Sequence, residues 1–359
     1  MSEIYLNYGT NLRGMTCELM ETAKISEKLD SAMRVCVKPN LVKESPAEEG
    51  ATTHPEIVEG IILYLRECGV RDIVIAEGSW TGGNTRRAFD VCGYTALAKK
   101  YDVALIDTKS DKVTRITSQG FELSLCESAL KADYLINVPV LKGHSQAKMT
   151  CCLKNLKGCI PDSEKRRFHT TGLHKPIAAL AAALKPDLHI VDGVCGDLNF
   201  EEGGSPVDAN RIMLGFDPVL LDSYGARLLG YEPEEIEHLR LAMEYGVGQF
   251  ARDDTRIIEL NENNKPKTRI SSSREAKRLG QFIDEDGACS PCYAALIFAL
   301  HRTGIELNEK IHIGQGFKGK TLEGIGVGKC TAGCALNIPG CPPKAADIAE
   351  ALRSIQSSS

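Results

Sequence analysis

The chain lacks the long apolar runs and the leader that mark membrane and secreted proteins. Its longest apolar runs, IAALAAAL and AALIFAL, are well short of the ~20 residues that a membrane span needs. The first residues, MSEIYLNYGT, contain neither the basic nor the apolar region of a signal peptide. We therefore expect a cytoplasmic protein that makes no membrane contact.

Motifs of several common activities are also missing. The sequence has no Walker A run, no G-x-G-x-x-G (EGSWTGG does not match it) and no serine nucleophile elbow. A net charge of −5 argues against general nucleic-acid binding. The 43% of hydrophobic residues is ordinary for a globular protein, and 359 residues predict two domains or one large domain with an appendage.

The first ~260 residues alternate β-rich runs with helical patterns, which is the signature of an α/β domain. MRVCVKPN, DIVIAEG, DVALIDT, DYLINVPVLK, DLHIVDG, RIMLGF and RIIEL are predicted strands. HPEIVEGIILYLRECG, TRRAFDVCG, GLHKPIAALAAAL and DPVLLDSYGARLLG are predicted helices. Because the strands are continuously apolar, the pattern predicts a doubly wound, mostly parallel sheet covered on both faces.

A polar, charged stretch divides the chain. The segment NENNKPKTRISSSREAK is nearly free of apolar residues, which is typical of a linker. We therefore predict an α/β domain over residues 1–262, a linker over 263–279 and a small C-terminal α/β module over 280–359.

Polar residues follow several predicted strands at the point where each strand ends. They are Lys38 and Asn40, Glu77, Lys142 and His144, and Asp192. A polar turn would explain any one of them. Because ligands of open α/β sheets bind beyond the carboxyl ends of the strands, their coincidence favours a shared cleft.

The segment from Lys142 to Lys175 is basic in a protein that is acidic overall. It holds eight Lys or Arg, two acidic residues and the histidines His144, His169 and His174. Such a local positive field attracts phosphate and carboxylate groups, so we expect Lys154 and Asn155 to contact a small anionic metabolite. A solvated basic loop is the alternative. The histidine spacing fits no standard metal motif, so His144 and His169, with Lys142, are candidate acid–base or anion-contact residues.

An ordered series of segments resembles a known family. VKPNLV, TTHPEIV, VPVLKGH, TCCLKNLKG, HIVDG and GFDPVLLD, between about Lys38 and Gly230, are similar to the signature segments of the family called domain of unknown function 362. The resemblance implies an α/β fold and an iron–sulfur centre, often on an attached ferredoxin-like segment, but no substrate. The chain departs from this pattern because it has no C-x2-C-x2-C-x3-C-P run.

Cysteines are the most informative residues of the chain. Nine of the fourteen are scattered through the first 195 residues, where most are expected to be small buried hydrophobes. The other five cluster near the end, in GACSPCYAALIFALHRTG and VGKCTAGCALNIPGCPP. Ser290 suits an N-cap and Pro291 a first helical position, and Pro342 and Pro343 suit the first turn of a second helix. Because a helix N-terminus favours anionic groups and lowers a thiol pKa, both ends are expected to present thiolates.

A Cys-x-x-Cys pair with distant cysteines, one of them followed by Pro, fits a [4Fe–4S] cluster. Structural Zn²⁺, with Cys289, Cys292, Cys330 and Cys334 as ligands, is the alternative, followed by a dithiol redox pair and by unliganded thiols. The resemblance implies Cys289, Cys292, Cys330 and Cys341 as cluster ligands, with Cys334 as the spare.

These observations favour an iron–sulfur redox enzyme that acts on a small phosphorylated or carboxylated substrate, with a ferredoxin-like electron partner. A lyase or dehydratase with an open iron site and an electron carrier without its own chemistry are the alternatives. A purely structural cluster would also suit so small a module. The sequence gives neither the substrate nor the oligomeric state.

Overall fold

The computed structural model describes residues 3–197, 201, 203, 206–265, 275–305 and 309–358. Its main element is an eight-stranded mixed sheet that is mostly parallel, as the sequence predicts. In spatial order the strands are β12 (Arg256–Leu260), β1 (Glu3–Tyr8), β11 (Pro206–Gly215), β10 (Leu188–Asp197), β7 (Tyr134–Val138), β2 (Arg34–Pro39), β3 (Asp72–Glu77) and β4 (Ala104–Asp107). β11 runs antiparallel to both of its neighbours, and the other neighbouring pairs are parallel.

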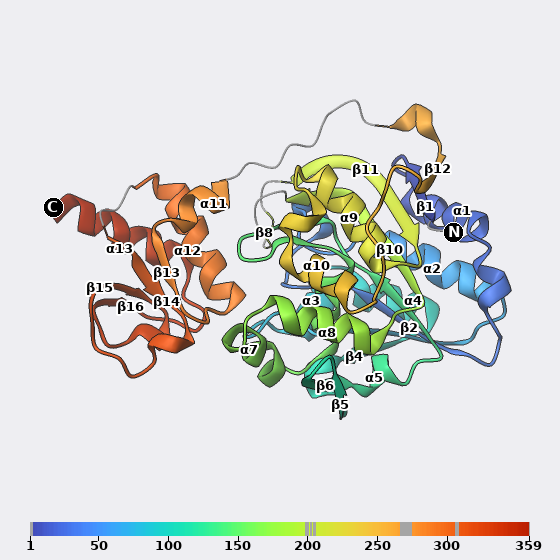
Figure 1. The fold of residues 1–359 in the computed structure, drawn as a ribbon. Coiled ribbons are helices and arrows are strands. Elements are labelled where there is room, and N and C mark those ends of the chain that lie inside the picture. The colour runs from blue at the N-terminus through green and yellow to red at the C-terminus, as the bar shows by residue number, and fades with distance from the viewer. Residues whose placement is uncertain are drawn as a thin grey trace.

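Helices cover both faces of this sheet (Figure 1). One face packs on α1 (Leu12–Thr22), α2 (Pro55–Glu67), α3 (Thr85–Val91) and α4 (Tyr94–Tyr101). The other packs on α5 (Glu127–Leu130), α6 (Cys152–Asn155), α7 (Asp162–Thr170), α8 (His174–Leu184), α9 (Pro218–Leu228) and α10 (Glu237–Glu244). Side chains of β2 alternate between them, because Val35 and Val37 enter the first core and Cys36 the second. This alternation explains why the strand is apolar throughout.

The predicted helices form for identifiable local reasons. In α2, Pro55 occupies the first turn, and Ile57, Ile61 and Leu65 are fully buried; burial of each such side chain contributes about 1.5–3 kcal/mol. Asp217 caps α9 by accepting hydrogen bonds from the backbone N–H groups of Val219 (2.8 Å) and Leu220 (3.0 Å). Such caps satisfy amides that have no partner within the helix.

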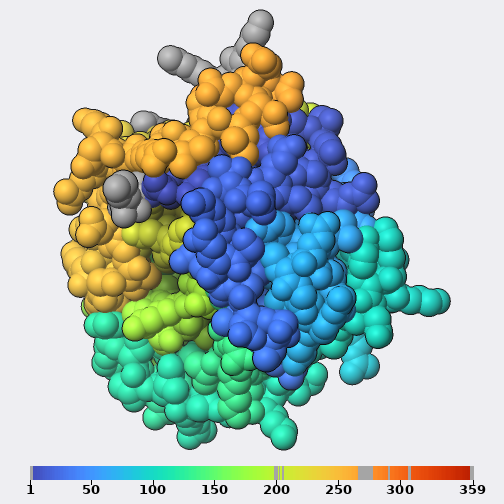
Figure 2. Space-filling model, turned by 90° about the vertical axis from the view of Figure 1, so that its right-hand side faces the viewer, coloured from blue at the N-terminus to red at the C-terminus, as the bar shows by residue number. Residues whose placement is uncertain are grey.

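Some elements differ from the sequence prediction. The predicted strand DYLINVPVLK ends at Val138, and Lys142 instead belongs to the hairpin of β8 (Lys142–His144) and β9 (Lys148–Thr150). A second hairpin, β5 (Val113–Ser118) and β6 (Phe121–Cys126), covers part of α8. β12 pairs with β1, and Figure 2 shows the orange segment that contains β12 lying along the blue N-terminal segment.

The C-terminal part forms a separate four-stranded parallel sheet. Its strands are β13 (Ile283–Glu285), β14 (Ile311–Ile313), β15 (Leu322–Val327) and β16 (Cys334–Ile338), with helices α11 (Glu275–Gly280), α12 (Ser290–Thr303) and α13 (Ala345–Ser358). This part has its own apolar core. Residues 266–274 of the predicted linker lie outside the described residues, and α11 covers the last residues of that linker and the first of the predicted module.

Candidate functional site

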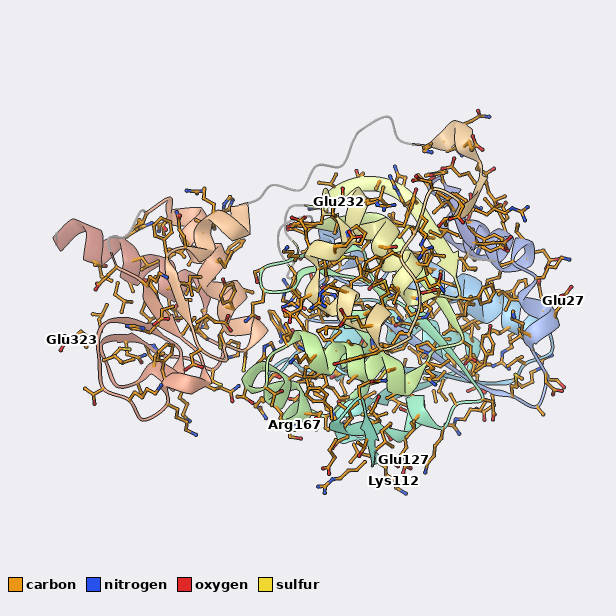
Figure 3. The ribbon with its side chains drawn as sticks, in the orientation of Figure 1. Glu27, Lys112, Glu127, Arg167, Glu232 and Glu323 are labelled. Atoms are coloured by element: carbon orange, nitrogen blue, oxygen red, sulfur yellow. The ribbon has the colours of Figure 1, made fainter. Side chains whose placement is uncertain are left out.

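The site lies where the chain reverses its direction across the large sheet. From β2 the chain proceeds outward to β3 and β4, and it returns to β7 on the other side of β2. The carboxyl ends of β2, β3 and β7 therefore meet at one edge, which is where open α/β sheets bind ligands. Figure 3 shows labelled charged side chains at the periphery, whereas several charged side chains at this edge are buried: Lys38, Glu77, Lys142, Lys154 and Glu201.

A buried ion pair joins two of the predicted site residues. The Lys38 amine donates to Glu77 Oε2 (2.6 Å), to the Pro39 carbonyl (2.8 Å) and to Asn155 Oδ1 (3.2 Å). Gly158 lies so close that a Cβ there would come 2.6 Å from the Lys38 amine. The structure brings Lys38, Glu77 and Asn155 into one group, but the Lys38 amine is buried, has three partners within the protein and does not line the pocket described below.

A second buried group is centred on Glu201. Its carboxylate lies 2.7 Å from the Lys154 amine and 2.8 Å from His144 Nε2. Burial alone would raise the pKa of Glu201, but the neighbouring His144 and Lys154 side chains hold it well below its usual range. Sequence reasoning missed Glu201, because nothing in the residues around it shows that its carboxylate lies beside Lys154 of α6.

Lys142 and Asp192 support the backbone around the site. The Lys142 amine donates to the carbonyls of Ala51 (2.6 Å) and Glu201 (2.8 Å). Asp192 Oδ2 accepts from the backbone N–H of His54 and lies 2.8 Å from its ring Nδ1. Neither side chain lines the pocket described below, so both act on the site through the backbone and side chains that they hold.

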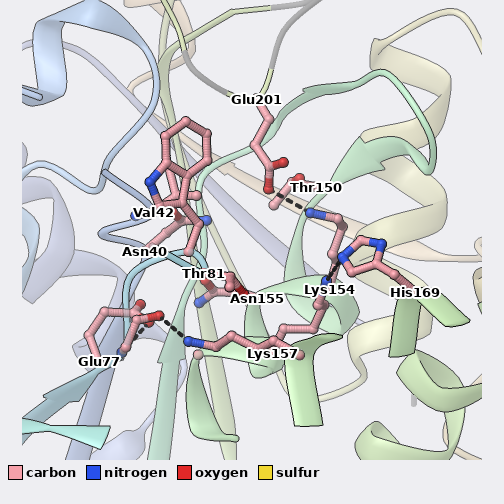
Figure 4. Close-up of a pocket in the computed structure, with 14 residues that line it drawn as sticks. Asn40, Val42, Glu77, Thr81, Thr150, Lys154, Asn155, Lys157, His169 and Glu201 are labelled. Carbon is pink, nitrogen blue, oxygen red and sulfur yellow. Dashed lines mark hydrogen bonds and ion pairs between the residues drawn. The ribbon is translucent and has the colours of Figure 1, made fainter. Parts of the chain in front are cut away.

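An open pocket lies between these groups (Figure 4). It is lined by Asn40, Val42, Glu77, Gly78, Trp80, Thr81, Thr150, Lys154, Asn155, Lys157, Gly158, Lys165, His169 and Glu201. Figure 4 shows Lys154 reaching Glu201, and the Lys157 amine lies 3.3 Å from His169 Nε2. The Lys165 amine donates to the carbonyls of Gly78 (3.0 Å) and Ser79 (2.8 Å). Asn40, Lys154, Asn155 and His169 therefore line one pocket, as predicted, and His144 contacts it through Glu201.

Burial changes the protonation of the basic groups in this pocket. It lowers the pKa of His144 to about 4 and that of His169 well below its ordinary value. Burial and the charge of Lys154 lower the pKa of Lys157 to about 7, and burial lowers that of Lys165 to about 8. Both histidines are therefore neutral at neutral pH, and the two lysines can exchange protons near it.

The C-terminal cysteines come from three separate segments. Cys289 is the N-cap of α12, and Cys292 lies in its first turn. Cys330 lies in the 3₁₀ turn Lys329–Thr331 after β15. Cys341 lies four residues before α13. This helix starts at Ala345 and not at Pro342, because Pro343 disfavours helical backbone geometry at the residue before it.

Four of these thiols are electrostatic neighbours. Burial raises the pKa of Cys292 to about 12, and the thiols of Cys289, Cys341 and Cys330 raise it too. Burial and then Cys330 and Cys341 raise the pKa of Cys289. The expectation that the helix ends lower these pKa values is therefore wrong for Cys289 and Cys292, because burial and the neighbouring thiols raise them.

Cys334 differs from these four. Burial is the sole cause of its raised pKa, and a Cβ added at Gly326 in β15 would lie 2.6 Å from its Sγ. Cys334 therefore packs between β15 and β16, outside the group of Cys289, Cys292, Cys330 and Cys341.

The four-thiol group lies on the side of the C-terminal part that contacts the pocket wall. Figure 1 shows α7 on the side of the α/β unit that faces the orange and red C-terminal part. Gln315 Nε2 donates to the Arg166 carbonyl of α7 (3.3 Å), and Gln146 Nε2 donates to the Ala288 carbonyl (3.2 Å). Lys157 lowers the pKa of Cys289, so the amine lies close enough to this thiol to influence its charge.

A different group of metal-type donors is buried behind the pocket. The ligand atoms of Cys151, Cys152 and Asp222 lie within 4.8 Å of one another and could hold a metal ion. Asp222, however, accepts hydrogen bonds from the backbone N–H groups of Cys152 (2.7 Å) and Leu153 (3.1 Å). Its carboxylate already serves as an anchor for the start of α6.

Comparison with known proteins decides the family. The model of Domain of unknown function (DUF362) matches residues 35–227, which is more than half of the chain. This chain belongs to the DUF362 family. The match confirms the resemblance described above and leaves the activity open. It ends before the C-terminal sheet, so the four-thiol group lies outside the segment that matches DUF362.

The DUF362 chain is also similar to individual proteins. It is 26% identical over 229 residues to thylakoid-associated protein sll1697 of Synechocystis sp., covering 62% of this chain and 71% of that one. Among solved structures it matches the lactate racemase apoprotein of Thermoanaerobacterium thermosaccharolyticum (TM-score 0.39, 14% identity, 67% of this chain) and a structural-genomics target from Thermotoga maritima (TM-score 0.38, 12% identity, 66% of this chain). The chain spans 56% and 60% of those two structures.

The described part of this DUF362 protein contains no helix with the length and apolarity needed to cross a bilayer. A relative is named for its association with thylakoids, so the cytoplasmic location stays a prediction.

Proposed function

We propose that this protein is an iron–sulfur redox enzyme that acts on a small phosphorylated or carboxylated substrate in the pocket of Lys154, Lys157 and His169. The observation that carries the proposal is the meeting of four thiols from three segments beside the wall of that pocket. A cation-lined pocket and a group of metal-binding thiols are the two parts that such an enzyme requires.

The donor set supports a [4Fe–4S] cluster over Zn²⁺. A tetrahedral zinc with bonds of about 2.3 Å needs sulfur atoms roughly 3.8 Å apart. Within the described residues, no three of the C-terminal thiols lie within 4.8 Å of one another, so their spacing is wider than a single zinc ion requires. Four cysteines are also the usual ligand set of a cubane cluster, which leaves the lyase alternative without an open iron site.

When bound, such a cluster supplies single electrons. The chain supplies the binding and the proton chemistry. Lys154 and the buried Thr150 hydroxyl would hold the anionic group of the substrate, and Glu201 keeps Lys154 in place. His169, neutral and next to the Lys157 amine, can pass a proton between that amine and the substrate. His144 contacts Glu201, so it orients the site without touching the substrate.

The electron partner would dock on the side of Cys330 and Cys341. Lys318 and Lys329 lower the pKa of Cys330 and therefore lie near it, and Cys341 is exposed. An acidic, ferredoxin-like carrier has the charge that suits this surface.

Anaerobic purification followed by iron, sulfide and zinc analysis tests the proposal. We expect about four irons and four sulfides per chain and an EPR signal on reduction that changes when phosphate or oxalate is added. A Lys154→Gln variant should keep the iron and lose that change. A preparation without iron would contradict the cluster, and a loaded protein whose signal ignores both anions would be an electron carrier.

A further inference from the structure

The three lysines that line the pocket differ in the ion-pair and hydrogen-bond partners of their amines. Lys154 is paired with Glu201, and Lys165 donates to two backbone carbonyls. Within the described part of the chain Lys157 forms no ion pair, and its one hydrogen-bond contact is with His169 Nε2 at 3.3 Å. Lys157 also lines the open pocket, so its amine is available to a bound molecule.

The surroundings of Lys157 favour the neutral amine. Burial and the neighbouring charge of Lys154 lower its pKa to about 7. A desolvated lysine beside a second cation is a recognised form of activated nucleophile, because the ammonium form is disfavoured while the amine stays accessible. An imidazole next to the amine completes the arrangement, since it can accept and return a proton.

We propose that Lys157 is a catalytic residue that forms a covalent imine with the carbonyl carbon of a small oxo acid bound in the pocket. This inference deepens the proposed function and rests on it for the identity of the site, because it names the substrate class. The carboxylate of the oxo acid would be held by Lys154 and by the buried, unpartnered Thr150 hydroxyl, both of which line the same pocket.

The step balances without an oxidant or a reductant. The Lys157 amine attacks the carbonyl carbon and forms a carbon–nitrogen bond, and His169 carries a proton from the nitrogen to the oxygen. The carbon–oxygen bond then breaks, and the oxygen leaves as water with the two protons that were on the amine. The product is a carbon–nitrogen double bond, which is a stronger electron acceptor than the original carbonyl once it is protonated.

Borohydride trapping tests the imine directly. The purified protein is incubated at pH 7 with pyruvate or glyoxylate, reduced with sodium cyanoborohydride, digested and mapped by mass spectrometry. An exposed lysine of pKa ~10.4 has on the order of a thousandfold less neutral amine at this pH. We therefore expect the adduct on Lys157 to exceed that on the exposed Lys175 at least tenfold.

Two variants and one control make the result decisive. Lys157→Arg keeps the positive charge and should abolish the adduct, whereas Lys175→Arg should leave it unchanged. Lactate, which has no carbonyl, should give no adduct. A Lys157 peptide that is labelled no more than the Lys175 peptide with both oxo acids would overturn the inference, as would labelling centred on Lys154 or Lys165.

The same experiment separates this inference from the proposed function. Trapping needs no cluster, so it is measured on protein whose iron content is known. Labelled Lys157 in a protein that never contains iron would support the imine and contradict the redox enzyme. A protein with iron and no labelling would contradict the imine alone.

Discussion

The two groups of cysteines show that closeness of donor atoms does not by itself make a metal site. Cys151, Cys152 and Asp222 are packed within 4.8 Å of one another, but they are fully buried and the carboxylate anchors two backbone amides. The thiols of Cys289, Cys292, Cys330 and Cys341 are further apart, partly exposed, and come from three segments. The carboxylate of the first group therefore has a structural role that needs no metal.

Removing one C-terminal thiol should have the largest effect. Burial and the thiols of Cys289, Cys341 and Cys330 raise the pKa of Cys292 to about 12, so this thiol lies well inside the group. Cys292→Ser should reduce the iron content from about four to under about one per chain, measured by iron analysis of anaerobic preparations. Cys334→Ser is the matched control and should keep its iron.

The buried group offers the opposite test. Asp222→Ala leaves the N–H groups of Cys152 and Leu153 without their acceptor, which costs about 1–3 kcal/mol in urea unfolding. The iron content should stay unchanged. Equal loss of iron in Asp222→Ala and Cys292→Ser would mean that the comparison between the two groups is wrong.

The Lys38–Glu77 pair should dominate the stability of the α/β part. Lys38→Met leaves the Glu77 carboxylate buried without its cation, which typically costs 3–5 kcal/mol. The double variant Lys38→Met, Glu77→Gln removes both charges and should recover part of this loss. Urea titrations of the two variants measure the difference, and a single variant as stable as the wild type would show that the pair is not closed in solution.

Acid should act on the α/β part through His144. The ordinary pKa of about 6.5 applies to the unfolded chain, and the folded value is about 4 because burial disfavours the imidazolium. Between these values the unfolded chain binds a proton that the folded chain does not, so stability is lost as the pH falls from ~6.5 to ~4, by up to ~3 kcal/mol. His144→Gln should flatten this dependence of the urea midpoint on pH, whereas His301→Gln, at an exposed position on α12, should not.

The contact between the two parts should give the smallest effect. Gln146→Ala removes the hydrogen bond to the Ala288 carbonyl, which contributes about 1 kcal/mol or less. Hydrogen exchange of the segment around Ala288 should become faster, with no change in a variant of the exposed Gln119. Unchanged exchange would mean that other contacts carry the docking of the C-terminal part.

The sequence predicted well what depends on local pattern. Alternating strands and helices predicted the sheet and its two covered faces, and strand ends predicted that Asn40 and Glu77 would lie near one another. The resemblance to the family separated Cys334 from the other C-terminal cysteines, and the structure places it apart from them. These results depend on periodicity, on the direction of strands and on short motifs, all of which are readable from a few neighbouring residues.

What could not be predicted depends on contacts between remote segments. The sequence predicts Lys38 as an anion ligand because it does not show that the Glu77 carboxylate lies 2.6 Å from the Lys38 amine. It also does not show that Glu201 lies beside Lys154. The thiol pKa values followed burial and mutual repulsion and not the helix ends. The sequence does not distinguish Lys157 from the other lysines of its segment. In the described structure Lys154 and Lys165 each have a carboxylate partner and Lys157 has none, and only the fold shows this difference.

The single tryptophan of the chain gives the protein a built-in optical probe. Trp80 lines the pocket, and its backbone N–H is bound to the Val42 carbonyl. All of the indole fluorescence of the protein therefore originates at the place where a substrate would bind. Titration of unlabelled protein with candidate anions can be followed by emission alone, and an iron centre near this indole would quench it and so report its own assembly.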